Sequence, residues 1–142
     1  MERPRIFLAD DHAEFLAVVV RLIEGEFEVV RTFQDGQAIV DAADMLDADL
    51  VVMDVSMPRL NGIEAARQLR AAGCQAKIVF LTVHNDQDYV RSALATGALG
   101  YVVKDRLVPD LVPALRHALV DHRFVSDCIA PELTDQAKTV QG

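Results

Sequence analysis

The chain has 142 residues, of which 51 % are hydrophobic and 25 % are charged, as is typical of one compact globular domain. Its net charge of −8 would repel a phosphate backbone, so we expect no binding of nucleic acid by this chain alone. The longest apolar run, residues 15–20, is far shorter than the roughly 20 residues of a membrane span, and the N-terminus lacks a signal-peptide core. Cys74 and Cys128 lack metal-ligand spacing, and we expect a reducing, cytoplasmic location.

Five segments have the composition of β-strands. Four are short, continuous apolar runs, as expected in a parallel sheet that is covered on both faces. The second in chain order is interrupted by Glu28 and Arg31, as suits a more peripheral strand. The expected strands are residues 6–9, 27–33, 50–53, 78–81 and 101–103.

Segments with helical periodicity separate the strands. The first is expected to bury one stripe and to stop at Gly25. Pro113 fits the last helix only if that helix begins near Asp110, which places the proline in the first turn. Strand and helix alternate five times, which predicts a doubly wound α/β sandwich. The expected helical stripes are Phe15, Val18, Val19, Leu22 and Ile23; Ile39, Ala42, Ala43 and Leu46; Ile63, Ala66, Leu69 and Arg70; Tyr89, Ala93 and Leu94; and Leu111, Leu115, Ala118 and Leu119.

The first helix also carries a second apolar stripe, formed by Leu16 and Val20. Three explanations remain open for it. The residues are scattered exposed apolar side chains, or they pair first and fifth helices in a symmetric homodimer, or the chain's own tail covers them. The tail repeats apolar residues at Val125, Ile129 and Leu133.

Polar residues follow the strands where each one ends. Asp10 and Asp11 follow the first strand, Asp54 the third, Thr82 the fourth and Lys104 the fifth. The carboxyl ends of parallel strands form the binding crevice of such a sheet, and an order of 2-1-3-4-5 would bring the three aspartates together there. Crowded carboxylates favour a divalent cation, and hard oxygen ligands with no competing His or Cys cluster favour Mg²⁺.

Each of these residues also has a purely structural explanation. Asp11 and Glu14 have the spacing of a capping box, so Asp11 could cap the first helix. Asp54 fits a turn, Thr82 a strand, and Lys104 a solvated surface. Together they favour a functional site, because successive strands place matching groups at the same edge.

The motifs resemble those of receiver domains from two-component response regulators. The similarity covers about residues 4–122, which leaves 123–142 as a tail or the start of an interdomain linker. Residues 9–12 and 97–105 resemble the NarL/FixJ (LuxR-type) group. The resemblance implies a flavodoxin-like (βα)5 fold with a five-stranded parallel sheet. The motifs are Leu8-Ala9-Asp10-Asp11-His12, Asp54-Val55-Ser56-Met57-Pro58 with Gly62, Leu81-Thr82 and Gly100-Tyr101-Val102-Val103-Lys104-Asp105.

The resemblance also implies a role for each site residue. Asp54 would be the phosphoacceptor, and the donor would be a phosphohistidine of a sensor histidine kinase or a phosphotransfer protein. Asp11 and Asp54 would ligate Mg²⁺ through carboxylates, Asp10 directly or through water, and Ser56 through its backbone carbonyl.

Two further residues would contact the phosphoryl group, and one would respond to it. Thr82 and Lys104 would bind phosphoryl oxygens, and Tyr101 would change rotamer together with Thr82. Such a chain catalyses only its own aspartyl phosphorylation and dephosphorylation and is not otherwise an enzyme.

Some positions depart from the family pattern. The β-branched Val83 is expected to narrow access to Asp54. Ser56 and His84 occupy positions that influence the access of water in this family. His84 either orients that water or is an exposed loop histidine without a role, and the second interpretation is favoured.

Other function classes fit less well. A flavodoxin would need a Ser/Thr/Gly-rich first loop, and a haloacid-dehalogenase-like phosphatase would need Asp-x-Asp after the first strand. Residues 10–13 provide neither. Two outputs remain open. The chain is the receiver of a transcription factor whose DNA-binding domain is absent from it, or it is a stand-alone receiver that acts by protein binding or phosphorelay.

Overall fold

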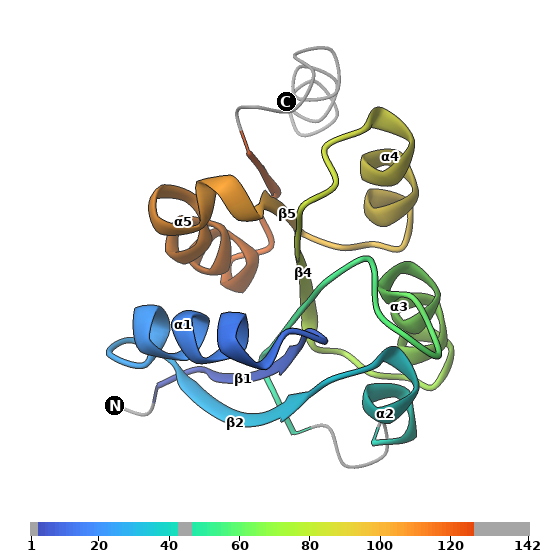
Figure 1. Ribbon diagram of the computed structural model, residues 1–142, viewed down its shortest axis with the longest axis horizontal. Coiled ribbons are helices and arrows are strands. Elements are labelled where there is room, and N and C mark those ends of the chain that lie inside the picture. Colours follow the sequence, from blue (N-terminus) through green and yellow to red (C-terminus); the bar gives the residue numbers. More distant parts are fainter. Residues whose placement is uncertain (1–2, 43–46, 127–142) are drawn as a thin grey trace.

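The computed structural model describes residues 3–42 and 47–126, in which strands and helices alternate along the chain (Figure 1). The strands are β1 (Arg5–Ala9), β2 (Glu28–Phe33), β3 (Leu50–Met53), β4 (Lys77–Thr82), β5 (Gly100–Val103) and β6 (Phe124–Val125). The helices are α1 (Ala13–Ile23), α2 (Gly36–Asp41), α3 (Gly62–Ala71), α4 (Gln87–Ala95) and α5 (Leu107–Leu119), with a short 3₁₀ helix, η2 (Lys104–Arg106), before α5.

The strands form one parallel sheet in the order β2-β1-β3-β4-β5-β6. This arrangement confirms the predicted order 2-1-3-4-5 and the doubly wound fold. It also adds a sixth strand that the sequence did not predict.

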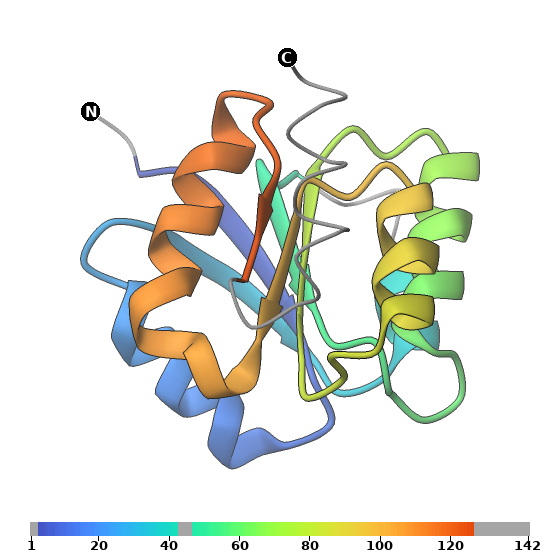
Figure 2. The same ribbon diagram turned by 90° about the horizontal axis from the view of Figure 1, so that it is seen from above.

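Helices cover both faces of the sheet. Figure 2 shows α1 and α5 on one side and α2, α3 and α4 on the other. Each face has its own apolar cluster: Phe7, Met53 and Phe80 belong to the α2–α4 side, and Leu8 and Val52 to the α1/α5 side. The burial of both faces explains why the central strands are continuously apolar. In contrast, β2 lies at the edge of the sheet and is partly exposed, as its interrupted pattern predicted.

The buried face of α1 differs from the prediction. Leu16, Val19 and Ile23 are buried, whereas Val18 is 52 % exposed. Val20 packs against the same apolar cluster. The helix is apolar on most of its circumference, so its periodicity did not specify which stripe faces the sheet. Leu16 is therefore covered within the described part of the fold and Val20 is covered in part, whereas a homodimer contact through this helix stays a prediction.

The start of α5 also differs from the prediction. The helix begins at Leu107 because η2 leads directly into it, so Pro113 lies in its interior rather than its first turn. Asp110 is instead buried in the first turn, where Arg106 lies 3.4 Å from its carboxylate. In α4 the structure buries Val90 and Ala93, not the predicted Tyr89.

The strand β6 extends the sheet beyond residue 122. Its backbone hydrogen bonds run from Phe124 N–H to Leu99 O, at 2.9 Å, and from Ser126 N–H to Tyr101 O, at 3.0 Å. The Ser126 hydroxyl also accepts a hydrogen bond from Val103 N–H at 3.2 Å, and its residue is fully buried. Of the predicted apolar repeat in the tail, Ile129 and Leu133 lie outside the described residues. None of the helices in the described ranges is long and apolar enough to cross a membrane.

Candidate functional site

Three strands bring Asp10, Asp54 and Lys104 together at the carboxyl edge of the sheet. Asp10 and Asp54 are only 3 % and 4 % exposed. The Lys104 ammonium lies 2.7 Å from Asp10 Oδ2 and 3.0 Å from Asp54 Oδ2, and its side chain is 11 % exposed. These contacts exclude the solvated-surface explanation for Lys104.

The two carboxylates stabilise the charged form of Lys104. Burial acts in the opposite direction, but hydrogen bonds and charge from Asp10 and Asp54 outweigh it, so the pKa of Lys104 lies above the usual value for lysine. The ammonium therefore remains a cation between two anions at neutral pH.

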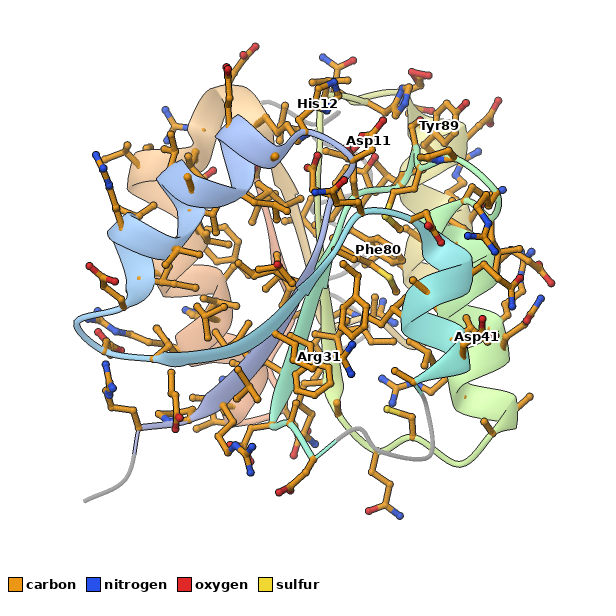
Figure 3. All side chains as sticks on the ribbon, turned by 60° about the horizontal axis from the view of Figure 1, so that its bottom comes forward. Asp11, His12, Arg31, Asp41, Phe80 and Tyr89 are labelled. Atoms are coloured by element: carbon orange, nitrogen blue, oxygen red, sulfur yellow. The ribbon has the colours of Figure 1, made fainter. Side chains whose placement is uncertain are left out.

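Asp11 lies at the same edge and does not cap α1. The N-cap residue is His12, without a side-chain cap, and its N–H donates to Asp10 Oδ1 at 2.9 Å. Ligand atoms of Asp10, Asp11 and His12 lie within 4.8 Å of one another. His12 Nδ1 is 3.1 Å from Asp11 Oδ1 and 3.3 Å from Asp10 Oδ1. A single histidine, and no His or Cys cluster, thus lies beside the two aspartates in the described residues. Figure 3 shows Asp11 and His12 side by side where α1 begins.

The loop after β3 wraps closely around Asp54. Ser56 N–H donates to Asp54 Oδ1 at 3.2 Å, and Gly62 N–H donates to Val55 O at 2.7 Å. A Cβ atom on Gly62 would lie 2.0 Å from the Asp54 backbone oxygen, so this position admits only glycine without a shift of the backbone. The first residue of α3 is thereby held against the backbone of Asp54.

Thr82 and Tyr101 are both buried beside this edge. His84 N–H lies 3.4 Å from Thr82 Oγ1, and the Tyr101 hydroxyl donates to His84 O at 2.7 Å. Burial raises the pKa of Tyr101, and the charges of Asp86 and Asp54 raise it further. The phenol is therefore a neutral hydrogen-bond donor, held in the inward position.

His84 is more than an idle loop residue, contrary to the favoured interpretation. Its Nε2 lies 2.5 Å from Ser56 Oγ, and its ring stacks on Tyr89 with the centroids 4.4 Å apart. The side chain thus connects the loop after β4 with the loop after β3. Val83, in contrast, is 63 % exposed.

Three residues near the site were not predicted from the sequence as part of it: His12, Tyr89 and Phe15. The Phe15 ring lies 4.4 Å from the Lys104 ammonium. The contacts of Tyr89 and Phe15 depend on how two separate elements orient their side chains, and periodicity carries no signal for that. His12 contacts its sequence neighbours Asp10 and Asp11.

The family model for the response regulator receiver domain matches residues 6–116. The chain belongs to this family. The nitrate/nitrite response regulator NarL of Escherichia coli K12 is 34 % identical over 134 residues, which cover 93 % of this receiver and 62 % of NarL. DegU of Brevibacillus brevis, a transcriptional regulatory protein, is 34 % identical over 134 residues, which cover 87 % of this chain and 57 % of DegU. The chain thus spans less than two thirds of these relatives.

Solved structures support the same assignment. A LuxR-family two-component response regulator from Aurantimonas has a TM-score of 0.84 and 30 % identity to this receiver, and the match covers 99 % of both chains. The isolated receiver domain of RcsB from Salmonella enterica, determined with the phosphomimetic BeF3⁻, has a TM-score of 0.81 and 25 % identity, covering 89 % of this chain and 95 % of that one. The predicted resemblance to LuxR-type receivers is confirmed.

Proposed function

We propose that Asp54 accepts a phosphoryl group from a phosphohistidine of a sensor histidine kinase or a phosphotransfer protein. The observation that carries this proposal is the position of the Lys104 ammonium, 3.0 Å from a nearly buried Asp54 carboxylate. A buried carboxylate beside a fixed cation can act as a nucleophile whose product, an acyl phosphate, meets that same cation.

In the transfer, an Asp54 oxygen forms a bond to phosphorus in line with the phosphorus–nitrogen bond of the donor, which breaks and leaves its electron pair on the imidazole. Negative charge is spread over three equatorial oxygens in the transition state. The Lys104 ammonium, the Thr82 hydroxyl and the Ser56 N–H are the groups that this chain offers to them. Catalysis would then consist mainly of positioning and charge stabilisation.

The acidic edge also fits a magnesium ion. Carboxylates of Asp10, Asp11 and Asp54 and the backbone carbonyl of Ser56 are hard oxygen donors, which Mg²⁺ prefers. When bound, the ion would neutralise charge on the phosphoryl oxygens. His12 already contacts carboxylate oxygens of Asp10 and Asp11, and Lys104 contacts those of Asp10 and Asp54. Both side chains would therefore compete with the ion for these oxygens.

Phosphorylation would act on the surface through Thr82 and Tyr101. A phosphoryl oxygen offers the Thr82 hydroxyl a charge-assisted hydrogen bond, and Tyr101 already occupies the inward position through its bond to His84 O. The modification would then stabilise this arrangement of α4, β5 and α5 rather than create it.

The output that we propose is control of transcription through a DNA-binding domain outside this chain. NarL and DegU, which are longer than the part matched here, carry names of transcriptional or nitrate-response regulators. A stand-alone receiver that acts by protein binding or phosphorelay is the alternative. A basic helix-turn-helix in a longer reading frame would favour the first.

Intact mass spectrometry with acetyl phosphate as a small-molecule donor tests the phosphosite. The wild type should gain one phosphoryl group in the presence of Mg²⁺, and Asp54→Asn should gain none. Asp11→Asn, which keeps the acceptor but removes a charged ligand, should need more Mg²⁺ for the same extent of modification. A modified Asp54→Asn protein, or full modification of the wild type in chelator, would refute the assignment.

A further inference from the structure

The aromatic ring of Phe15 covers one side of the Lys104 ammonium. Phe15 lies in the first turn of α1, which follows β1 in the chain. Lys104 follows β5, which lies three strand positions away from β1 in the sheet. The distance from Lys104 Nζ to the centroid of the ring is 4.4 Å, within the range in which a cation is attracted to an aromatic face.

The surroundings make this contact stronger than one at the surface. The side chain of Lys104 is 11 % exposed, and Phe15 is partly buried against the apolar cluster on the α1/α5 face. A void of only about 10 Å³ lies among Phe15, Asp10 and Asp54, which is at the lower limit of what one water molecule needs. Because Asp10, Asp54 and Lys104 are nearly buried, solvent screens the charges beside the ring only weakly.

The ring also completes the set of partners around the ammonium. An ammonium group has three N–H donors, and the carboxylates of Asp10 and Asp54 accept from Lys104 at 2.7 Å and 3.0 Å. Neither carboxylate restrains the remaining side of the nitrogen. The electron-rich face of Phe15 is a partner for that side, and it does not neutralise the charge as a third carboxylate would.

We propose that Phe15 is a positioning residue for phosphoryl transfer, because it holds the Lys104 ammonium between Asp10 and Asp54 through a cation–π contact. This inference rests on the proposed function of Asp54. Phe15 is a ligand neither of the phosphoryl group nor of the metal ion in this role. It acts through Lys104, whose cation must already be in place when charge develops on the transferred group.

The contact has a spectroscopic signature that is independent of phosphorylation. The chain contains three lysines, at positions 77, 104 and 138, so selective ¹³C-lysine labelling gives a simple spectrum. The ε-methylene protons of Lys104 should be shifted upfield by the ring, and Phe15→Leu should abolish that shift while Phe15→Tyr keeps it. Phe124→Leu is the matched control, because Phe124 is also partly buried against the same apolar cluster but does not contact Lys104.

The kinetic test uses acetyl phosphate and saturating Mg²⁺. Phe15→Leu should be phosphorylated on the order of fivefold more slowly than the wild type, Phe15→Tyr about as fast, and Phe124→Leu unchanged. Replacing Phe15 by phenylalanines with one, two and three ring fluorines keeps the ring shape but weakens its negative face, so the rate should fall stepwise along the series. This series also covers the case in which Phe15→Leu does not fold.

The two measurements separate failure of this inference from failure of the proposed function. If no variant, including the wild type, is phosphorylated on Asp54 while the upfield shift of Lys104 is present, the proposed function is wrong and a positioning role for Phe15 falls with it. If the wild type is phosphorylated but the Lys104 shift is absent, or the rate is the same across the fluorine series, the inference about Phe15 is overturned and Asp54 remains the acceptor.

Discussion

At the scale of single residues, the charges at the site are unequal in number. Asp10, Asp11 and Asp54 carry three negative charges and Lys104 carries one positive charge, which leaves a net charge of −2 on these four residues. A single divalent cation balances this remainder. Lys104 contacts Asp10 and Asp54 directly, whereas the side chain of Asp11 is the most exposed of the three acids.

The raised pKa of Tyr101 predicts that the free energy of unfolding falls at alkaline pH. Burial raises its pKa above the ordinary value of 10.0, so the folded protein keeps the phenol neutral where the unfolded chain ionises it. This contribution to stability is complete below pH 10 and is lost as the pH rises, by about 1.4 kcal/mol for each pH unit above 10. In Tyr101→Phe, the free energy of unfolding should fall less steeply over this range, as measured by urea denaturation at several pH values.

At neutral pH the same substitution has a different effect. It removes the hydrogen bond to His84 O, so Tyr101→Phe should be about 1 kcal/mol less stable than the wild type at pH 7. The curves of the two proteins should therefore converge at alkaline pH. Parallel curves would mean that Tyr101 ionises equally easily in the folded and unfolded states. The pKa of Lys104 is also raised, and its contribution is lost in both proteins alike above the ordinary lysine value of 10.5.

At the scale of elements, α5 contains a residue, Pro113, that destabilises the helix. Pro113 lies in the helix interior and cannot donate to the carbonyl of Pro109, so one hydrogen bond of the helix is missing. Pro113→Ala should restore it and raise the free energy of unfolding by about 2 kcal/mol, after allowance for the greater freedom of the unfolded chain. Urea denaturation measures the difference.

Pro109 provides the matched control. It lies in the first turn of α5, where a backbone N–H has no partner within the helix, so Pro109→Ala should change stability little or lower it slightly. Equal effects of the two substitutions would show that the helix does not lose a hydrogen bond at Pro113.

The elements also show what the sequence was able to predict. Strands with both faces buried stand out as continuous apolar runs, and each site residue lies at the end of one of them, so the pattern predicted one shared sheet edge for Asp10, Asp54 and Lys104. The strand order came from the resemblance to receiver domains rather than from the pattern. The rotation of α1 did not follow from the pattern, because nearly all of its residues are apolar. The contacts of His84 and Phe15 did not either, since they join side chains from loops and helices far apart in the chain.

At the scale of the whole molecule, we propose that the folded unit extends to Ser126. A chain that ends after residue 122 loses β6, the hydrogen bonds of Phe124 and Ser126 to β5 and its preceding loop, and the cover over the edge of β5. We expect it to be about 2–4 kcal/mol less stable than the full chain and to self-associate through the exposed strand edge.

A chain that ends after residue 126 is the control for this truncation. It keeps β6 and the buried Ser126 hydroxyl, so its urea midpoint and its size in solution should match those of the full chain. A chain ending at residue 122 with the stability of the full protein would place the boundary before β6, as the sequence suggested.

Parallel strands all point the same way, and β6 shares the direction of β3 and β5. Ser126 therefore lies beside Val103, at the sheet edge from which Asp54 and Lys104 project. Three strand spacings separate β3 from β6, a distance of roughly 14 Å. A fluorophore attached directly after Ser126 would thus start within one Förster radius of Asp54. Asp54 and Ser126 therefore lie at the same end of the sheet, and contact between their surroundings does not need to pass through the apolar core.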